Sequence, residues 1–262
     1  MDAGKGNIFN LLNGLKQYLI PVYQRLYSWE LTQCQRLWND IVAMQKENRE
    51  GHFLGSIVCI AEKTAPTGVQ KYMVIDGQQR LTTLTLVLIA LRDSVAEDSN
   101  INVDQLNTSF LVNQYESGDN KYKLLLTDED RDVLISLIEN KPIKVGTKSK
   151  LLDAYNYFKS QIAKNEIAHQ LLFEATGKLQ IVIITLERDH DDPQAIFESL
   201  NSTGKELSQS DLIRNYVLMG MDKETHKKSI GLIRKVSDLF SLHKGNFALS
   251  AKLEVSLVEA QA

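Results

Sequence analysis

The sequence predicts an α+β fold in which a small sheet packs with helices. Three observations lead to this prediction. Short β-rich apolar runs, typical of strands, occur at 53–60, 72–75 and 180–186. A nearly all-round apolar run at 81–91 has the character of a buried, central helix. The stretch 94–177 is polar with helical periodicity, which predicts a helical insertion.

The first element is an extended segment at 20–27, because Pro21 fixes its own backbone and disfavours a helical conformation at Ile20. Ser28 then has the side chain of a helix cap. The helix that follows is predicted to end at Gly51 and to bury one face, since apolar residues recur at helical spacing at Leu31, Cys34, Leu37, Trp38 and Ile41.

The runs at 53–60 and 72–75 are predicted to be two strands of one sheet, because a polar connection with Pro and Gly separates them. The second strand leads through the polar turn 76–80 directly into the apolar helix 81–91. After the insertion, the chain is expected to return as a β-branched strand at about 180–186.

Capping patterns predict the remaining helix starts. Thr127 with Asp130 three residues later marks one start in the insertion. A helix over 192–200 begins with an aspartate and a proline in the favoured order. Another follows from 208 to 220, opened by a second capping box. A further insertion helix is marked by the apolar residues Leu151, Tyr155, Phe158 and Ile162.

Composition excludes several classes of protein. The 262 residues are 43% hydrophobic and 24% charged, which is ordinary for a globular chain and excludes disorder. With 30 basic and 33 acidic residues the net charge is −3, so no basic surplus drives the whole molecule onto nucleic acid or anionic lipid. The longest apolar stretch, 84–91, is too short to cross a bilayer, and the amino terminus lacks a signal sequence. We therefore expect a cytoplasmic protein with no membrane partner.

The spacing of cysteines and histidines speaks against a zinc hydrolase. Cys34 and Cys59 have no partner at metal-ligand spacing, so they are predicted to be core thiols. None of the five histidines lies one helical turn from another, as a zinc-binding helix requires.

The strongest candidate for chemistry is the run Asp76-Gly77-Gln78-Gln79-Arg80, at the amino end of the buried helix. Free backbone N–H groups and the positive dipole end attract anions there. Arg80 adds a planar fork that suits phosphate oxygens, and the glutamines can orient a water. The run is not a Walker A loop. The alternative interpretation is structural: Asp76 caps the helix, Gly77 makes the turn, and the other side chains are solvated.

A second polar loop precedes a helix start at 201–205. Gly204 would present backbone amides to a phosphate or metal, and Lys205 would add a point charge. The alternative is an ordinary interhelical turn that contains a glycine. Two interpretations of Arg25 also remain: it lies in the same groove as the 201–205 loop, or it is an ordinary surface arginine. The remaining loop residues are Asn201, Ser202 and Thr203.

Four segments together resemble the amino-terminal domain of GmrSD-type restriction enzymes. The resemblance covers about residues 8–220, and the segments agree in order and spacing. They are 20–29 (IPVYQRLYSW), 53–57 (FLGSI), 74–83 (VIDGQQRLTT) and 196–215 (IFESLNSTGKELSQSDLIRN).

The resemblance implies a fold and a site. The fold would be a ParB/sulfiredoxin-like mixed sheet with packed helices, which binds and hydrolyses a nucleoside triphosphate of unknown base with Mg²⁺. Its catalytic residues would be Asp76, Gln78, Gln79 and Arg80, where Asp76 holds Mg²⁺ or polarises water, the glutamines place water or phosphate, and Arg80 contacts phosphate. The nucleotide-binding residues would be Tyr23, Gln24, Arg25, Gly77, Thr82, Asn201, Ser202, Thr203, Gly204 and Lys205.

Matched onto this chain, the resemblance divides it into a nucleotide-binding lobe at 1–96, a helical insertion at 97–178, strand and helices that complete the lobe at 179–220, and a divergent tail at 221–262. It implies a nucleoside triphosphatase module that gates a nuclease in a bacterial anti-phage type IV restriction system. A His-Asn-His-type nuclease supplied separately and DNA are the expected macromolecular partners, and no cutting of DNA is expected from this chain alone.

Two alternatives stay open. One is a nucleotide-switched DNA-binding or interaction module of the ParB kind, without significant turnover. The other is a truncated or frameshifted remnant, because the tail departs from the family pattern after about Gly220.

Overall fold

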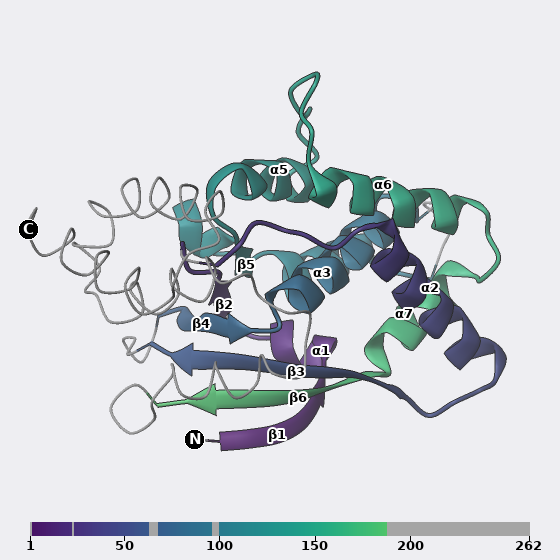
Figure 1. Cartoon of the computed structure of the whole chain (residues 1–262), viewed down its shortest axis with the longest axis horizontal. Coiled ribbons are helices and arrows are strands. Elements are labelled where there is room, and N and C mark those ends of the chain that lie inside the picture. The colour runs from purple at the N-terminus through teal and green to yellow at the C-terminus, as the bar shows by residue number, and fades with distance from the viewer. Residues whose placement is uncertain (1, 23, 63–67, 96–99, 188–262) are drawn as a thin grey trace, which may run out of the picture. The chain divides into compact units, whose positions relative to one another are not determined.

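A computed structural model places most of the first 187 residues (Figure 1). The chain divides into two compact units, and the first contains residues 1–21 and 26–191. The sheet, the helices and the candidate site below belong to this first unit. The residues that the structure describes are 2–22, 24–62, 68–95 and 100–187.

Six strands of the described chain form one mixed sheet, which confirms the α+β class. The outer pair β1 and β6 and the central pair β3 and β4 are antiparallel. The pairs β6–β3, β4–β2 and β2–β5 are parallel. In order across the sheet, the strands are β1 (Asp2–Asn7), β6 (Leu179–Leu186), β3 (His52–Ala61), β4 (Gln70–Asp76), β2 (Lys16–Leu19) and β5 (Leu124–Leu125).

The three strands expected from β-rich runs are confirmed as β3, β4 and β6. The other three strands have no such run, because β1 is rich in glycine and polar residues and β2 and β5 are short. Neighbouring strands supply the hydrogen bonds that fix them. Since β5 lies within 94–177, that stretch contributes an edge strand as well as helices.

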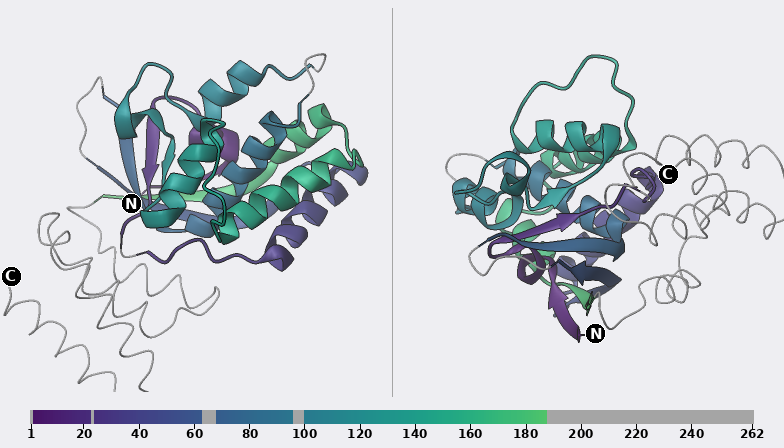
Figure 2. Two further views of the ribbon diagram at one scale, coloured as in Figure 1. Left: turned by 90° about the horizontal axis from the view of Figure 1, so that it is seen from above. Right: turned by 90° about the vertical axis from the view of Figure 1, so that its left-hand side faces the viewer.

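Helices stack above the strands in Figure 1, where α3 lies over β3 and β4 and α6 lies over α3. Figure 2 shows the same packing from two further directions. The α-helices are α1 (Ile8–Leu12), α2 (Leu31–Lys46), α3 (Gln78–Arg92), α4 (Val103–Leu106), α5 (Asp128–Ile138), α6 (Lys150–Ala163) and α7 (His169–Gly177). Two short helices of other types lie between α4 and β5: the π-helix η1 (Asn107–Leu111) and the 3₁₀ helix η2 (Gly118–Lys121).

Helix α3 is the centre of the core, as its all-round apolar sequence predicts. Every side chain from Leu81 to Leu91 is buried. The helix contacts α6, η1, α4, α7 and β3. Its threonines satisfy their hydroxyls locally, because Thr83 donates to the Gln79 carbonyl and Thr85 to the Leu81 carbonyl.

Helix α2 corrects one expectation. Its cap is Glu30, whose N–H donates to Gln33 Oε1 over 2.9 Å, and Ser28 lies two residues before it. Tertiary contacts place Ser28 outside the helix, since its N–H donates to Gln79 Oε1 of α3 and its Oγ has no hydrogen-bond partner among the described residues. The helix also ends at Lys46, before Gly51. Of the expected apolar face, Cys34, Leu37, Trp38 and Ile41 are buried, whereas Leu31 is exposed.

Two insertion helices follow their predicted starts and faces. Helix α6 buries all four of its expected apolar residues. Helix α5 follows Thr127, but the Thr127 side chain makes no cap hydrogen bond. The Asp130 carboxylate accepts the Tyr27 N–H. Cys34 and Cys59 are free and buried, as expected of core thiols.

Several predicted elements lie outside the described residues: the helices at 192–200 and 208–220, the loop at 201–205 and the tail from 221. The four-part division of the chain stays a prediction. Within the part that is described, no helix combines the length and apolar character needed to cross a membrane.

Candidate functional site

The Asp76–Arg80 run lies at the junction of β4 and α3, as predicted. Strand β4 ends at Asp76, Gly77 turns the chain, and α3 begins at Gln78. Gly77 has a φ of 88°, and a Cβ there would lie 2.8 Å from the Ser56 carbonyl oxygen of β3. Glycine is therefore needed twice, for the left-handed turn and for the close approach to the neighbouring strand.

Arg80 lies against β3 at Gly55 and Ser56. Its Nη1 donates to the Ser56 carbonyl over 2.7 Å and lies 3.7 Å from Asp76 Oδ2. Neither Nε nor Nη2 makes a hydrogen bond to any described residue. These two nitrogens form one edge of the guanidinium, the edge that can bind two phosphate or carboxylate oxygens together.

A glycine of β3 makes room for that guanidinium. Gly55 has a φ of 116°, and a Cβ built on it would lie 3.0 Å from Arg80 Cζ. The pairing of β3 with β6 shifts register between Phe53 and Gly55. Because Gly55 has no side chain and the strand is irregular there, the Arg80 guanidinium can lie directly against the backbone of β3.

The two glutamines of the run, Gln78 and Gln79, are both buried. Gln79 Oε1 accepts the N–H groups of Ser28 and Trp29, and its Nε2 donates to the Leu26 carbonyl. Gln79 therefore fixes the backbone of 26–29 against α3. Its expected role in placing a water stays a prediction.

Thr82 lies on the next turn of α3 and is 1% exposed. Its Oγ1 has no hydrogen-bond partner among the residues described. A buried hydroxyl without a partner costs free energy. A bound ligand would supply that partner, so the Thr82 hydroxyl is compatible with the expected nucleotide-binding role.

A pocket of about 270 Å³ opens beside Arg80. Its walls come from the segment before α2, from the first half of α2, from the start of β3 and from Arg80 itself. At its far side, His52 Nε2 lies 3.4 Å from Asp40 Oδ2. The lining residues are Trp29, Gln33, Arg36, Leu37, Asp40, His52, Phe53, Leu54 and Arg80.

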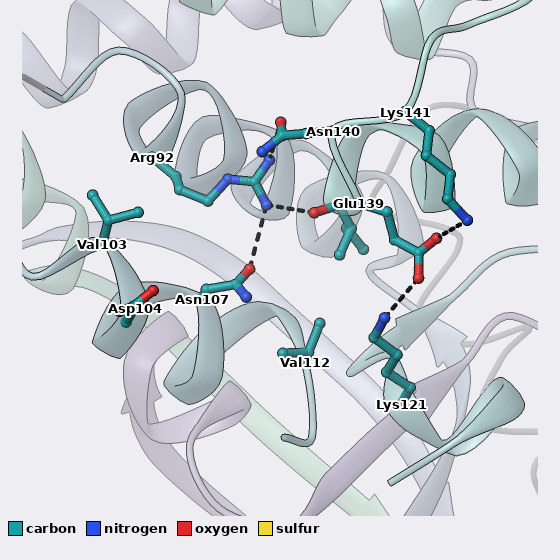
Figure 3. Close-up of a pocket in the computed structure, with 10 residues that line it drawn as sticks. Arg92, Val103, Asp104, Asn107, Val112, Lys121, Glu139, Asn140 and Lys141 are labelled. Atoms are coloured by element: carbon teal, nitrogen blue, oxygen red, sulfur yellow. Dashed lines mark hydrogen bonds and ion pairs between the residues drawn. The ribbon is translucent and has the colours of Figure 1, made fainter. Parts of the chain in front are cut away.

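A second, larger pocket of about 600 Å³ is shown in Figure 3. Its buried Arg92 donates from Nη1 to the Ile138 carbonyl and from Nη2 to the Leu137 carbonyl. These are carbonyls of the last turn of α5, so Arg92 caps that helix. Because its donors are used in this way, we assign this pocket a structural role.

Glu139 lies at the edge of the same pocket, between Lys121 and Lys141 (Figure 3). Hydrogen bonds from Lys121, Lys141 and the Tyr122 hydroxyl lower the pKa of Glu139 to about 2. A carboxylate with a lowered folded-state pKa stabilises the fold above its ordinary pKa and loses that contribution as the pH falls.

We therefore expect Glu139→Gln to cost about 1–3 kcal/mol at pH 7, as for a hydrogen bond to a charged group. The difference from wild type should shrink as the pH falls from about 4.5 to about 2. Urea unfolding at pH 7, 4 and 3 measures it, with the exposed Glu174→Gln as control. A difference that is the same at all three pH values would contradict the assignment.

The remaining predicted site residues lie outside the first unit or outside the described residues. Tyr23 and the loop Asn201, Ser202, Thr203, Gly204 and Lys205 lie outside the described residues. Gln24 and Arg25 belong to the second unit, which consists of Val22–Arg25 and Asp192–Ala262. Their roles stay predictions.

Sequence reasoning did not identify the residues that surround Arg80. Gly55 and Phe53 fall within the segment 53–57, and a glycine inside a strand is a known sign of a bulge or close backbone approach. That sign was available. Arg36 and Asp40 had no comparable signal, because on an amphipathic helix they resemble ordinary solvated residues.

The residues present are compatible with a nucleotide-borne metal rather than a metal held by protein alone. No group of three His, Cys, Asp or Glu side chains within the described ranges could hold an ion. Asp76 supplies one carboxylate, and Mg²⁺ bound with phosphates commonly takes only one or two from the protein.

Comparison with known proteins gives one family. The model of the family described as "GmrSD restriction endonuclease, N-terminal domain" matches residues 8–218. This range includes both sides of the β4–α3 junction, the pocket beside Arg80 and every strand of the sheet except β1. None of the curated proteins matches the chain.

Proposed function

Because this chain belongs to the GmrSD restriction endonuclease N-terminal domain family, we propose that it binds and hydrolyses a nucleoside triphosphate and thereby gates a DNA nuclease in an anti-phage type IV restriction system. The family itself makes the chain a restriction-system component with a nuclease as partner. Nucleotide turnover, gating, DNA contact and a cytoplasmic location are parts of the proposal.

The observation that carries the proposal is the Nε and Nη2 edge of Arg80, which makes no hydrogen bond to a described residue and lies at the amino end of α3. The helix has no side-chain cap, so its first N–H groups and its positive dipole end add to the attraction for anions. A planar fork beside a helix start suits the paired oxygens of a phosphate.

The other members of the run would act around that phosphate. Asp76 would hold Mg²⁺, which would neutralise charge on the phosphates when bound. Gly77 lets the backbone approach, and Thr82 would supply a hydroxyl that has no partner among the described side chains.

A second candidate function is the nucleotide-controlled switch without significant turnover. The contacts of Gln79 favour it, because an amide that already binds the backbone at Leu26, Ser28 and Trp29 is not available to orient a water. In this version, nucleotide binding would shift a conformational equilibrium that the partner senses.

Phosphate release separates the two functions. The full chain is incubated with each of the four nucleoside triphosphates and Mg²⁺, with and without DNA, and binding is measured in parallel. Turnover above the no-protein control supports the hydrolase. Tight binding with no release supports the switch, and absence of binding to all four contradicts both.

Asp76→Asn should lower turnover more than triphosphate affinity, because the change removes the charge that would hold Mg²⁺ and keeps the shape of the side chain. The melting temperature should stay near that of wild type, since Asp76 makes no cap hydrogen bond to α3. Steady-state phosphate release and thermal melting check this, with the exposed Asp132→Asn as control. Unchanged turnover with a lowered melting temperature would make Asp76 a structural residue.

A further inference from the structure

We propose that the pocket beside Arg80 receives the base of the nucleotide, stacked against Phe53 and Trp29, while the phosphates lie on Arg80. The inference rests on the proposed function and adds to it the part of the site that holds the base. The pocket and the motif are continuous, because Arg80 belongs to both. A volume of about 270 Å³ is enough for one base with part of its ribose.

Two aromatic side chains give the pocket its affinity for a planar ring. Phe53, at the start of β3, is 61% exposed. Most of this large apolar side chain therefore does not pack against the core. Trp29 is half-buried and packs against the core, so it forms a fixed wall. Aromatic faces of this kind are the usual stacking partners of nucleic-acid bases.

The charges of the pocket select an anionic ligand. Arg80 presents its unused guanidinium edge, and Arg36 has no ion pair with a described residue. Against these two cations stands one carboxylate, Asp40, which His52 already approaches at 3.4 Å. A ligand with an aromatic part and several negative charges fits this combination, whereas an uncharged apolar ligand would pair neither with Arg36 nor with the Nε and Nη2 edge of Arg80.

Polar atoms are available for the edge of the base. Gln33 uses its Oε1 to accept from Glu30 and Thr32, while its Nε2 makes no hydrogen bond to a described residue. Asp40 can accept through the carboxylate oxygen that His52 does not approach. One donor and one acceptor therefore face the place where a base edge would lie.

Gln79 connects the pocket to the motif. By accepting the Trp29 N–H at 3.3 Å and the Ser28 N–H at 2.8 Å, it fixes the aromatic wall to the first turn of α3. In this arrangement Gln79 keeps Trp29, which would contact the base, at a constant distance from Arg80, which would contact the phosphates.

The test compares two ligands that differ by the nucleoside. Binding of each nucleoside triphosphate and of inorganic tripolyphosphate, both with Mg²⁺, is measured by titration calorimetry on the full chain. Phe53→Ala should weaken binding of the preferred nucleotide by about tenfold, the usual size of one lost stacking contact, and leave tripolyphosphate binding unchanged. Phe53→Trp should restore nucleotide binding. Arg80→Ala should weaken both ligands.

Tyr115→Ala is the matched control, because Tyr115 is 93% exposed and lies outside the pocket. It should bind both ligands like wild type. Wild-type nucleotide affinity in a folded Phe53→Ala variant would overturn the base pocket and leave the proposed function standing. Equal losses for nucleotide and tripolyphosphate would also overturn it. Failure of the wild-type chain to bind any nucleotide would overturn both proposals.

Discussion

Replacing Arg80 with alanine is expected to weaken triphosphate binding tenfold or more. The Nε and Nη2 edge has no hydrogen bond to a described residue, so its donors are available to the ligand. A charge-assisted, bidentate contact contributes about 1.5–3 kcal/mol to binding. Titration calorimetry with the nucleotide and Mg²⁺ measures the loss.

The fold should survive this change. Arg80 lies in the first turn of α3 with a side chain 29% exposed, and its removal costs the bond to the Ser56 carbonyl and the weak pair with Asp76. Arg80→Lys should also bind poorly, because an ammonium keeps the charge but cannot form the fork. The exposed Arg49→Ala serves as control. Wild-type affinity in a folded Arg80→Ala chain would remove Arg80 from the site.

The largest loss of stability is expected from Arg92→Met, about 3–5 kcal/mol, as for breaking a buried ion pair. The Arg92 side chain is almost fully buried and lies 2.7 Å from Asp93 Oδ1. The substitution keeps the apolar stem but removes the donors to Asp93 Oδ1 and to the Leu137 and Ile138 carbonyls, while the Tyr155 hydroxyl still donates to Asp93 Oδ2.

Urea unfolding at pH 7 measures the loss, and Arg131→Met is the matched control. Arg131 pairs with Asp119 at an exposed site, where the expected cost is at most about 1 kcal/mol. Similar losses for the two variants would show that Arg92 does not hold α3 to the end of α5. Nucleotide binding by folded Arg92→Met should equal that of wild type, because the pocket around Arg92 lies outside the candidate site.

Local patterns predicted the elements that carry their own signal. Helix α3 is apolar on every side, so it must be surrounded by other elements to keep its side chains out of water. Its place in the core therefore followed from the sequence alone. The apolar spacing of α6 gave its buried face, and the β-rich runs gave β3, β4 and β6. The junction at 76–80 was predicted for the same reason, since a strand, a glycine turn and a helix follow one another along the chain.

Elements that depend on distant partners were not predictable in this way. Strands β1, β2 and β5 exist because neighbouring strands supply their hydrogen bonds. Helix α2 begins after Glu30 and not after Ser28, whose N–H binds Gln79, 51 residues away. Asp130 likewise makes a long-range contact, because its carboxylate accepts the Tyr27 N–H.

The candidate site shows the same division. Spacing along the chain was enough to place Asp76, Gly77 and Arg80 at the start of a buried helix. The packing of α3 against β3 sets how Arg80 is used, since Nη1 is bound to the Ser56 carbonyl while Nε and Nη2 have no bond to a described residue. The tertiary structure also brought Phe53 and Trp29 to the pocket beside Arg80. Hydrogen bonds and pocket walls between segments far apart in sequence depend on how strands and helices pack, and a local sequence pattern does not encode that packing.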